Sequence, residues 1–281
     1  MGARDYGSDA YWIDRYEKRG DAKKSKKRTR DDDDDDVTDE WLLSWAALRP
    51  LLLDRLRPYG GANIIDLGCG TSALPLDMLR DVDESTRVIA VDIARGAIEY
   101  QSRQRKLRLA SGESSACRAC FSVVDVTLSD AQLEVCDVSI DKSTTDGLLC
   151  DVDGGAARVR AMYTNLGGWL RRGAPALVAV CSWRDPEDED GLAWLLDLVL
   201  SSVRSGAIAA GDATSYAWSL DIHTLVSRGG GRGPHVYLLG RRPRRRSARL
   251  SRLDRRASGD DPDDADEEEE IRMRHHVHEE A

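Results

Sequence analysis

A glycine-rich turn that begins with an acid is the part of the chain best suited to chemistry. Residues 66–70 read Asp-Leu-Gly-Cys-Gly and close the apolar run at 63–67. Gly68 and Gly70 let the backbone turn tightly and approach a ligand with no Cβ in the way, and the helix expected after them offers free backbone N–H groups. Taken alone, this pattern fits a nucleotide-binding loop and a merely tight turn about equally well.

Two further acids favour a bound nucleotide or nucleoside. Asp92 ends the next expected strand, where its carboxylate can accept hydrogen bonds from both ribose hydroxyls, and it follows the glycines by about 20 residues, as in dinucleotide-binding folds. Asp125 ends the strand after that, within reach of the exocyclic amine of an adenine. With Asp66, three acids stand at the ends of three successive strands, and this predicts one shared pocket.

The turn favours S-adenosylmethionine over a nicotinamide dinucleotide. A pyrophosphate needs the pattern G-x-G-x-x-G with little negative charge nearby, but Ala73 stands at the position of the third glycine. The carboxylate of Asp66 would repel a pyrophosphate, whereas it suits a ligand with an ammonium group and a sulfonium centre. We therefore expect S-adenosylmethionine as the cofactor.

Short β-branched runs alternate with longer helical stretches, which is typical of βαβ units around a parallel sheet. Strands are expected at 63–67, 87–93, 121–126, 135–141, 176–181, 216–225 and 235–239, and helices at 73–80, 94–109, 154–172 and 191–204. The glycine-rich stretch 229–233 predicts a hairpin between the last two strands. The predicted fold class is α/β, with a doubly wound, mostly parallel seven-stranded sheet and a C-terminal antiparallel hairpin.

Charge is concentrated in two blocks outside the expected sheet. Residues 23–36 read KKSKKRTRDDDDDD, and residues 243–281 contain arginines followed by a run of acids. Both blocks lack the apolar side chains whose burial could offset chain ordering, so both are expected to be disordered, with the folded domain at 37–242. A net charge of −9, with basic and acidic runs that cancel locally, argues against a nucleic-acid surface, although the arginines leave weak RNA contact open.

Signals for a membrane, a metal or a disulfide framework are weak. No apolar run approaches the ~20 residues that cross a bilayer, and residues 1–10 are acidic where a targeting peptide would be basic, so a cytoplasmic or nuclear protein is expected. Cys117 and Cys120 have zinc-knuckle spacing without a second pair, and no metal is expected. His223 and His235 are expected to be structural.

The chain resembles the class I S-adenosylmethionine-dependent methyltransferases, and within them a protein-lysine branch that acts on elongation factor 1-alpha and on citrate synthase. Three segments carry the resemblance: 11–16 (Tyr-Trp-Ile-Asp-Arg-Tyr), 66–72 (Asp-Leu-Gly-Cys-Gly-Thr-Ser) and 140–149 (Ile-Asp-Lys-Ser-Thr-Thr-Asp-Gly-Leu-Leu). The last segment is similar to the branch's signature acid-Lys-Gly-Thr-Leu-Asp-Ala-Leu. The resemblance extends from about Tyr11 to Leu239 and implies a Rossmann-like methyltransferase fold.

The resemblance also implies roles for individual residues. Residues 1–22 would close over the cofactor through Trp12 and Tyr16, joined by Trp41 beyond the charged insert. Ordinary packing of these aromatics is the alternative. Further cofactor contacts would come from Gly68 to the methionine moiety, Asp92 with Ile93 to the ribose, Asp125 with Val126 to the adenine, and Lys142 in the pocket wall. The signature's glycine and leucine are Ser143 and Thr144-Thr145 here, which leaves the acceptor specificity open.

Asp141, at the end of the fourth expected strand, is predicted to orient the acceptor amine. A cap of that strand, or a pair with Lys142, is the alternative. The expected acceptor is a lysine side chain of a protein substrate, such as a translation elongation factor or another abundant protein. A small-molecule or RNA acceptor, or a catalytically silent binding module, are the competing hypotheses. The loops at 183–191 and 226–234 would choose the acceptor, and the sequence gives no indication of oligomeric state.

Overall fold

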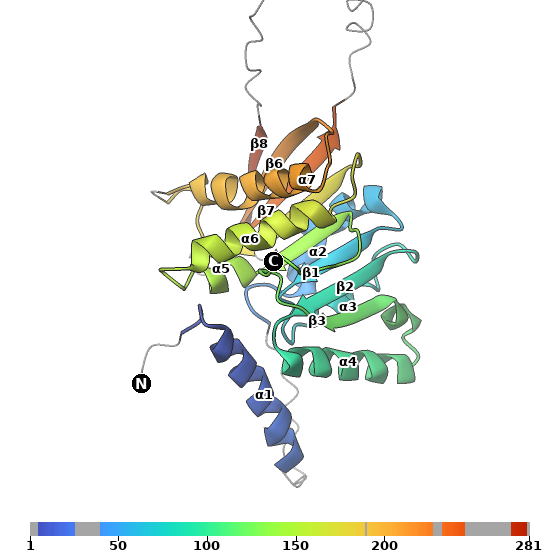
Figure 1. The fold of residues 1–281 in the computed structure, drawn as a ribbon. Helices are drawn as coiled ribbons and strands as arrows, with labels where there is room; N and C mark the ends of the chain where they lie inside the picture. The colour runs from blue at the N-terminus through green and yellow to red at the C-terminus, as the bar shows by residue number, and fades with distance from the viewer. Residues whose placement is uncertain (1–4, 26–39, 189, 227–231, 245–270, 280–281) are drawn as a thin grey trace, which may run out of the picture.

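The computed structural model describes residues 5–25, 40–188, 190–226, 232–244 and 271–279 of the 281-residue chain. Most of the charged insert expected at 23–36, and residues 245–270 of the expected tail, lie outside the described residues, so disorder there stays a prediction. The described segments form a single sheet with helices on both faces (Figure 1). Within these segments, no helix is both long and apolar enough to cross a membrane.

Eight strands form the sheet, in the spatial order β3-β2-β1-β4-β5-β7-β6-β8. Their bounds are β1 (Asn63–Leu67), β2 (Arg87–Asp92), β3 (Ala119–Val123), β4 (Val138–Lys142), β5 (Ala176–Ser182), β6 (Tyr216–Val226), β7 (Arg232–Pro243) and β8 (Arg272–Glu279). The strands from β3 to β5 are parallel, and β7 runs antiparallel between β5 and β6. This arrangement confirms the predicted doubly wound sheet. The strand order reverses between β1 and β4, where ligands bind in such folds.

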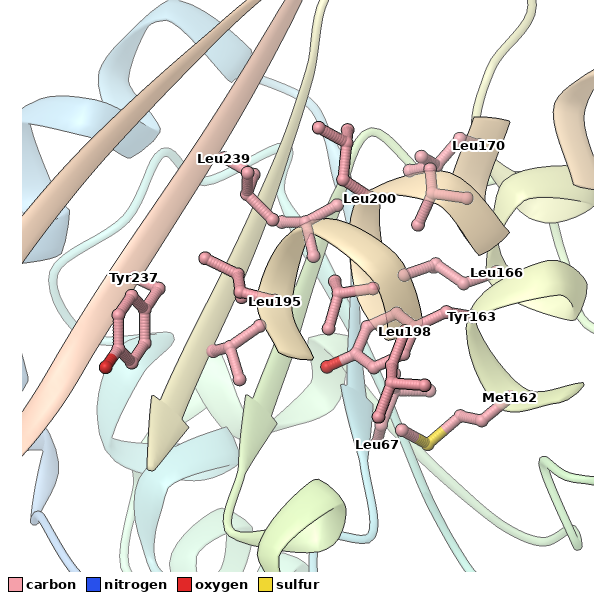
Figure 2. Packing of buried hydrophobic residues seen from close by; sticks show 14 of the residues in the cluster. Leu67, Met162, Tyr163, Leu166, Leu170, Leu195, Leu198, Leu200, Tyr237 and Leu239 are labelled. Atoms are coloured by element: carbon pink, nitrogen blue, oxygen red, sulfur yellow. The ribbon is translucent and has the colours of Figure 1, made fainter. Parts of the chain in front are cut away.

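Helices cover both faces because the strands alternate their side chains between two cores. Ile65 and Leu67 of β1 pack on the face of α6 (Gly155–Trp169), the π-helical turn Leu195–Leu200 and α7 (Ser201–Ala209), whereas Ile64 packs on the face of α2 (Trp45–Leu56) and α3 (Leu74–Met78). Figure 2 shows the first of these cores, with side chains of α6 and of the π-helical turn packed together. The remaining α-helices are α1 (Asp9–Ser25), α4 (Arg95–Ala110) and α5 (Thr144–Leu148).

The sheet differs from the expectation at several strand ends and by one additional strand. β3 ends at Val123, so Asp125 lies in the following loop, and β4 begins at Val138, three residues later than predicted. An eighth strand, β8, lies inside the tail, so the prediction of disorder is wrong for Arg272–Glu279. The physical reason is that β8 pairs in parallel along all of its length with β6, whose edge would otherwise present unpaired backbone groups.

All five histidines of the chain lie on the last three strands of the sheet, where β6 pairs with β7 and β8: His223 on β6, His235 on β7, and His275, His276 and His278 on β8. His223 Nδ1 and His278 Nε2 are 2.8 Å apart. Burial, reinforced by the neighbouring His278, lowers the pKa of His223 to about 4. Beside the histidines, Asp221 pairs with Arg55 of α2 at 2.6 Å and with Arg274 of β8 at 2.9 Å. The docking of β8 therefore places its histidines beside a neutral His223 imidazole and a buried carboxylate.

Candidate functional site

A cavity of about 310 Å³ opens at the carboxyl edge of β1, β2, β3 and β4, and we call it the carboxyl-edge cavity. Its size and its place at the reversal of strand order are those of a small-molecule site. Of the twelve residues predicted for the site, ten line this cavity: Trp12, Tyr16, Trp41, Gly68, Gly70, Asp92, Ile93, Asp125, Val126 and Lys142. Asp66 and Asp141 are the two that do not line it.

The turn after β1 has the backbone that its glycines predict. Gly68 has φ of +67° and Gly70 has φ of +51°, both in the left-handed region. A Cβ at Gly68 would overlap Thr144 Oγ1, and one at Gly70 would come within 2.6 Å of Tyr16 Oη. Gln101 of α4 holds the turn by donating its Nε2 to the carbonyl oxygen of Gly70 at 3.1 Å. The turn is therefore a tight cradle, whose packing against Thr144 and Tyr16 requires that both positions lack a Cβ.

Asp92 joins this turn to the end of β2. Its Oδ2 accepts from the Gly70 N–H at 2.8 Å, and its Oδ1 accepts from the Ala94 N–H at 2.8 Å. Burial raises the pKa of Asp92, although both backbone hydrogen bonds oppose that rise. Each carboxylate oxygen keeps a further lone pair, so the group can also accept hydrogen bonds from the hydroxyls of a bound sugar.

Asp125 also lines the cavity, from the loop after β3. Its Oδ1 accepts from the Thr127 backbone N–H at 2.9 Å and from Thr127 Oγ1 at 2.6 Å. These two bonds fix one oxygen and leave the other to a ligand. The loop positions Asp125 beside Val126, which is buried, so this wall combines one polar group with an apolar surface suited to a flat ring.

Aromatic rings from the N-terminal part of the chain form another wall. The ring of Trp12 stacks on Tyr16 with centroids 6.2 Å apart and meets Trp41 edge-on at 5.5 Å. Trp12 Nε1 donates to the carbonyl oxygen of Tyr6 at 2.8 Å, and Tyr16 is buried against the start of α4. The rings thus pack on one another and also line the cavity, so the two roles considered for them are compatible.

Lys142, at the end of β4, ties this aromatic wall to the sheet. Its Nζ donates to the carbonyl oxygen of Trp41 at 2.8 Å and lies 3.5 Å from Glu40 Oε2. Glu40 in turn accepts from the Ala73 N–H at 2.6 Å, just before the first turn of α3. The ammonium group of Lys142 is therefore already engaged by the segment that carries Trp41.

The two predicted residues outside the cavity point into the protein. Asp141 accepts hydrogen bonds from the Thr144 N–H at 2.8 Å, from Thr145 Oγ1 at 2.5 Å and from Tyr163 Oη at 2.7 Å. Burial raises the pKa of Asp141 to about 6 and that of Asp66 to about 7. Asp141 thus accepts hydrogen bonds from the start of α5 and from Tyr163 of α6 and does not line the cavity, and its role toward the acceptor stays a prediction.

Sequence reasoning missed several residues of the cavity, above all Asp146 on α5 and Trp183 after β5. Asp146 belongs to the same segment as Asp141, so a second acid in the signature was the available signal. The N-terminal residues Asp9 and Tyr6 also line the cavity, and Asp9 pairs with Arg158 of α6. The cavity is therefore closed by contacts between the first residues of the chain and its middle.

The described ranges contain no cluster of three or more His, Cys, Asp or Glu side chains suited to a metal ion. Cys117 and Cys120 are free thiols, and Arg87 Nη2 donates to Cys120 Sγ at 3.7 Å. The zinc-knuckle spacing of this pair is thus not accompanied by further ligands in the part of the chain that the structure describes.

No protein-family model matches the chain. It is 28% identical over 170 residues to the mitochondrial citrate synthase-lysine N-methyltransferase CSKMT of Danio rerio, a match that covers 56% of this chain and 62% of the relative. The chain thus spans less than two thirds of that relative's length. Solved structures that are similar include TrmN from Thermus thermophilus, with a TM-score of 0.44 and 18% identity over 67% of this chain and 47% of that one. Another is precorrin-6y C5,15-methyltransferase from Geobacter metallireducens, with a TM-score of 0.46 and 11% identity over 76% of this chain and 96% of that one.

The Danio rerio relative agrees with the resemblance carried by the segments at 11–16, 66–72 and 140–149. The sheet order and the glycine turn are those of a Rossmann-like fold. The chain is therefore similar to the class I S-adenosylmethionine-dependent methyltransferases, and within them to the protein-lysine branch.

Proposed function

We propose that the protein is an S-adenosylmethionine-dependent methyltransferase that methylates a lysine side chain of a protein substrate. The observation that carries the proposal is the chemistry of the carboxyl-edge cavity, which brings together aromatic rings and carboxylates. Its two basic side chains are engaged, Lys142 by the carbonyl oxygen of Trp41 and Arg158 by Asp9. A cavity of this kind favours positively charged ligands.

The residues present fit an adenosyl donor. Asp92 would accept hydrogen bonds from the ribose hydroxyls, and Asp125 beside Val126 would hold the adenine. Gly68 and Gly70 would let the methionine part lie against the backbone, since neither residue places a Cβ on the turn. When bound, S-adenosylmethionine would supply a methyl carbon already activated on a sulfonium. The aromatic wall would stabilise that positive charge through the faces of its rings.

A lysine acceptor suits the same surroundings. Its ammonium has an unperturbed pKa near 10.4, so it must lose a proton before it can attack, and desolvation in a narrow cavity lowers that pKa. The Danio rerio relative is named as a lysine methyltransferase, which supports this acceptor. The exposed Glu187 and Asp188 in the loop after β5 favour a basic protein segment over an RNA backbone. A cytoplasmic or nuclear location remains part of the proposal.

The cofactor half is tested by calorimetry with S-adenosylhomocysteine on the wild-type protein and on Asp92→Asn. We expect binding by the wild type and at least tenfold weaker binding by the variant, because a hydrogen bond to a charged group contributes about 1.5 to 3 kcal/mol. Circular dichroism establishes that the variant is folded. No binding by the wild type at millimolar ligand would refute the proposal and support a silent binding module.

The acceptor half is tested by incubating the protein with methyl-labelled S-adenosylmethionine and a cell lysate, followed by mass spectrometry of the labelled fraction. The proposal expects label on lysine side chains of protein. Label confined to RNA or to small molecules would refute the lysine acceptor while leaving the methyltransferase activity in place.

A further inference from the structure

The lining of the carboxyl-edge cavity includes Asp146 of α5 and Trp183, the first residue after β5. Asp146 Oδ1 accepts from Ser182 Oγ at 2.5 Å, and its Oδ2 accepts from the Trp183 backbone N–H at 3.0 Å. Both donors come from the end of β5, which is buried along its whole length. The carboxylate is therefore held in one orientation by a rigid strand.

The indole of Trp183 is unusual for its position. It follows a fully buried strand, yet 59% of its surface is exposed, and it lines the cavity. An exposed aromatic ring that lines a cavity offers a large apolar surface to a ligand bound there. The backbone N–H of the same residue fixes Asp146, so the ring and the carboxylate are presented together.

The carboxylate retains capacity for a further donor. A carboxylate offers about four lone-pair positions, and the hydrogen bonds from Ser182 Oγ and from the Trp183 N–H use one on each oxygen of Asp146. Burial raises the pKa of Asp146, and the hydrogen bonds and the nearby Arg184 only partly oppose that rise. The guanidinium of Arg184 lies over the ring of Trp194, 5.8 Å from its centroid. An incoming cation would therefore relieve a desolvated negative charge.

We propose that Asp146 and Trp183 form the subsite that binds the acceptor lysine, with the carboxylate on its ε-nitrogen and the indole on its methylene stem. This inference rests on the proposed function and assigns its acceptor side. The methylene stem packs its apolar surface against the exposed indole, and this contribution does not depend on whether the amine is protonated. Asp146 orients the nitrogen; the proton that the amine loses goes to water.

The candidate cofactor residues and the acceptor pair come from different elements. The residues that fit the cofactor lie on the turn after β1, at the end of β2 and in the loop after β3, whereas Asp146 lies on α5 and Trp183 directly follows β5. A substitution in the acceptor subsite should consequently change methyl transfer without changing cofactor affinity. A merely structural role for the pair would not produce that split.

The test uses Asp146→Asn, Trp183→Ala and Trp183→Phe in the full chain. The matched control is Ile208→Ala, which removes another exposed apolar side chain, 71% exposed, on α7 and away from the cavity. Calorimetry measures affinity for S-adenosylhomocysteine. The initial rate of labelled methyl incorporation into lysine of lysate proteins is measured over a range of lysate concentrations.

We expect at least a tenfold lower rate at limiting lysate for Asp146→Asn and Trp183→Ala, with S-adenosylhomocysteine affinity within threefold of the wild type. Trp183→Phe should restore most of the rate, and Ile208→Ala should match the wild type. Unchanged rates, or parallel loss of affinity and rate, would overturn the assignment. A wild type that binds S-adenosylhomocysteine but labels no lysine overturns the lysine subsite alone, whereas one that binds no S-adenosylhomocysteine refutes the proposed function itself.

Discussion

Replacing Asp141 with asparagine discriminates between a buried cap and a group that faces the acceptor. The asparagine keeps one oxygen for the Thr144 N–H, and its amide can donate to Thr145 Oγ1 and Tyr163 Oη, so the fold should survive. The substitution removes the titratable carboxyl group, whose pKa is raised by burial from 3.8 to about 6. At about 1.4 kcal/mol per pKa unit, this rise corresponds to about 3 kcal/mol of stability that depends on pH.

The sign follows from the direction of the rise. A carboxyl whose pKa is higher in the folded state stabilises the fold below its unfolded pKa, and that stability is lost as the pH rises through about 6. Between about pH 5 and about pH 8, the loss amounts to about 1.4 kcal/mol for a folded pKa near 6. Between these two pH values, the free energy of unfolding should therefore fall by about 1.4 kcal/mol more for the wild type than for Asp141→Asn.

Urea unfolding of both proteins at the two pH values measures this difference, in which the other titrating groups cancel. Affinity for S-adenosylhomocysteine and the rate of methyl transfer should stay within about threefold of the wild type for Asp141→Asn. The reasoning would be refuted if the unfolding free energies of the two proteins changed with pH in parallel while Asp141→Asn lost most of its turnover. That result requires a carboxylate that titrates normally and acts on the acceptor.

Two further perturbations test the cradle and the eighth strand. Gly68→Ala should weaken S-adenosylhomocysteine binding at least tenfold, because the alanine Cβ would overlap Thr144 Oγ1 at a φ of +67°. The control is Gly112→Ala, which has a φ of +91° but no atom within 4 Å of the added Cβ, and it should leave binding unchanged. Equal effects of the two substitutions in calorimetry would contradict this prediction. Acid should loosen β8, because the pKa of His223 is lowered to about 4, so its stability is present above pH 6.5 and is lost as the pH falls through 4. Hydrogen-exchange protection factors of β8 amides should therefore drop between about pH 7 and about pH 5, and unchanged protection would count against a role for His223.

The parts of the fold that are buried on both sides could be predicted closely from sequence. β1, β2 and β5 are short, almost wholly apolar runs bounded by polar residues, and the structure places their ends within one residue of the expected positions. β8 could not be predicted in this way, because it has little apolar surface to bury. Its residues form a strand because β6 offers an unpaired edge, and that edge exists only once the sheet is assembled.

The site residues that could be predicted from sequence are those at or just after the carboxyl ends of the strands. The glycines, Asp92 and Asp125 stand where a parallel sheet must bring its carboxyl ends together, and all of them line the cavity. The choice between Asp141 and Asp146 was not fixed by sequence. The two acids are five residues apart, on either side of the start of α5, and only the packing of α6 decides that Asp141 turns toward Tyr163.

The way the aromatic wall is anchored bears on how the two halves of the cavity can work together. The carbonyl oxygen of Trp41 accepts a hydrogen bond from Lys142 of β4. Trp12 lies on α1, and the first residue of this helix, Asp9, pairs with Arg158 of α6. The cofactor side is therefore closed by two attachments that lead to different elements, and neither attachment passes through Asp146. Asp146 is instead held by Ser182 and Trp183 at the end of the buried strand β5. Entry of a protein lysine at this subsite therefore need not disturb the contacts that hold the cofactor.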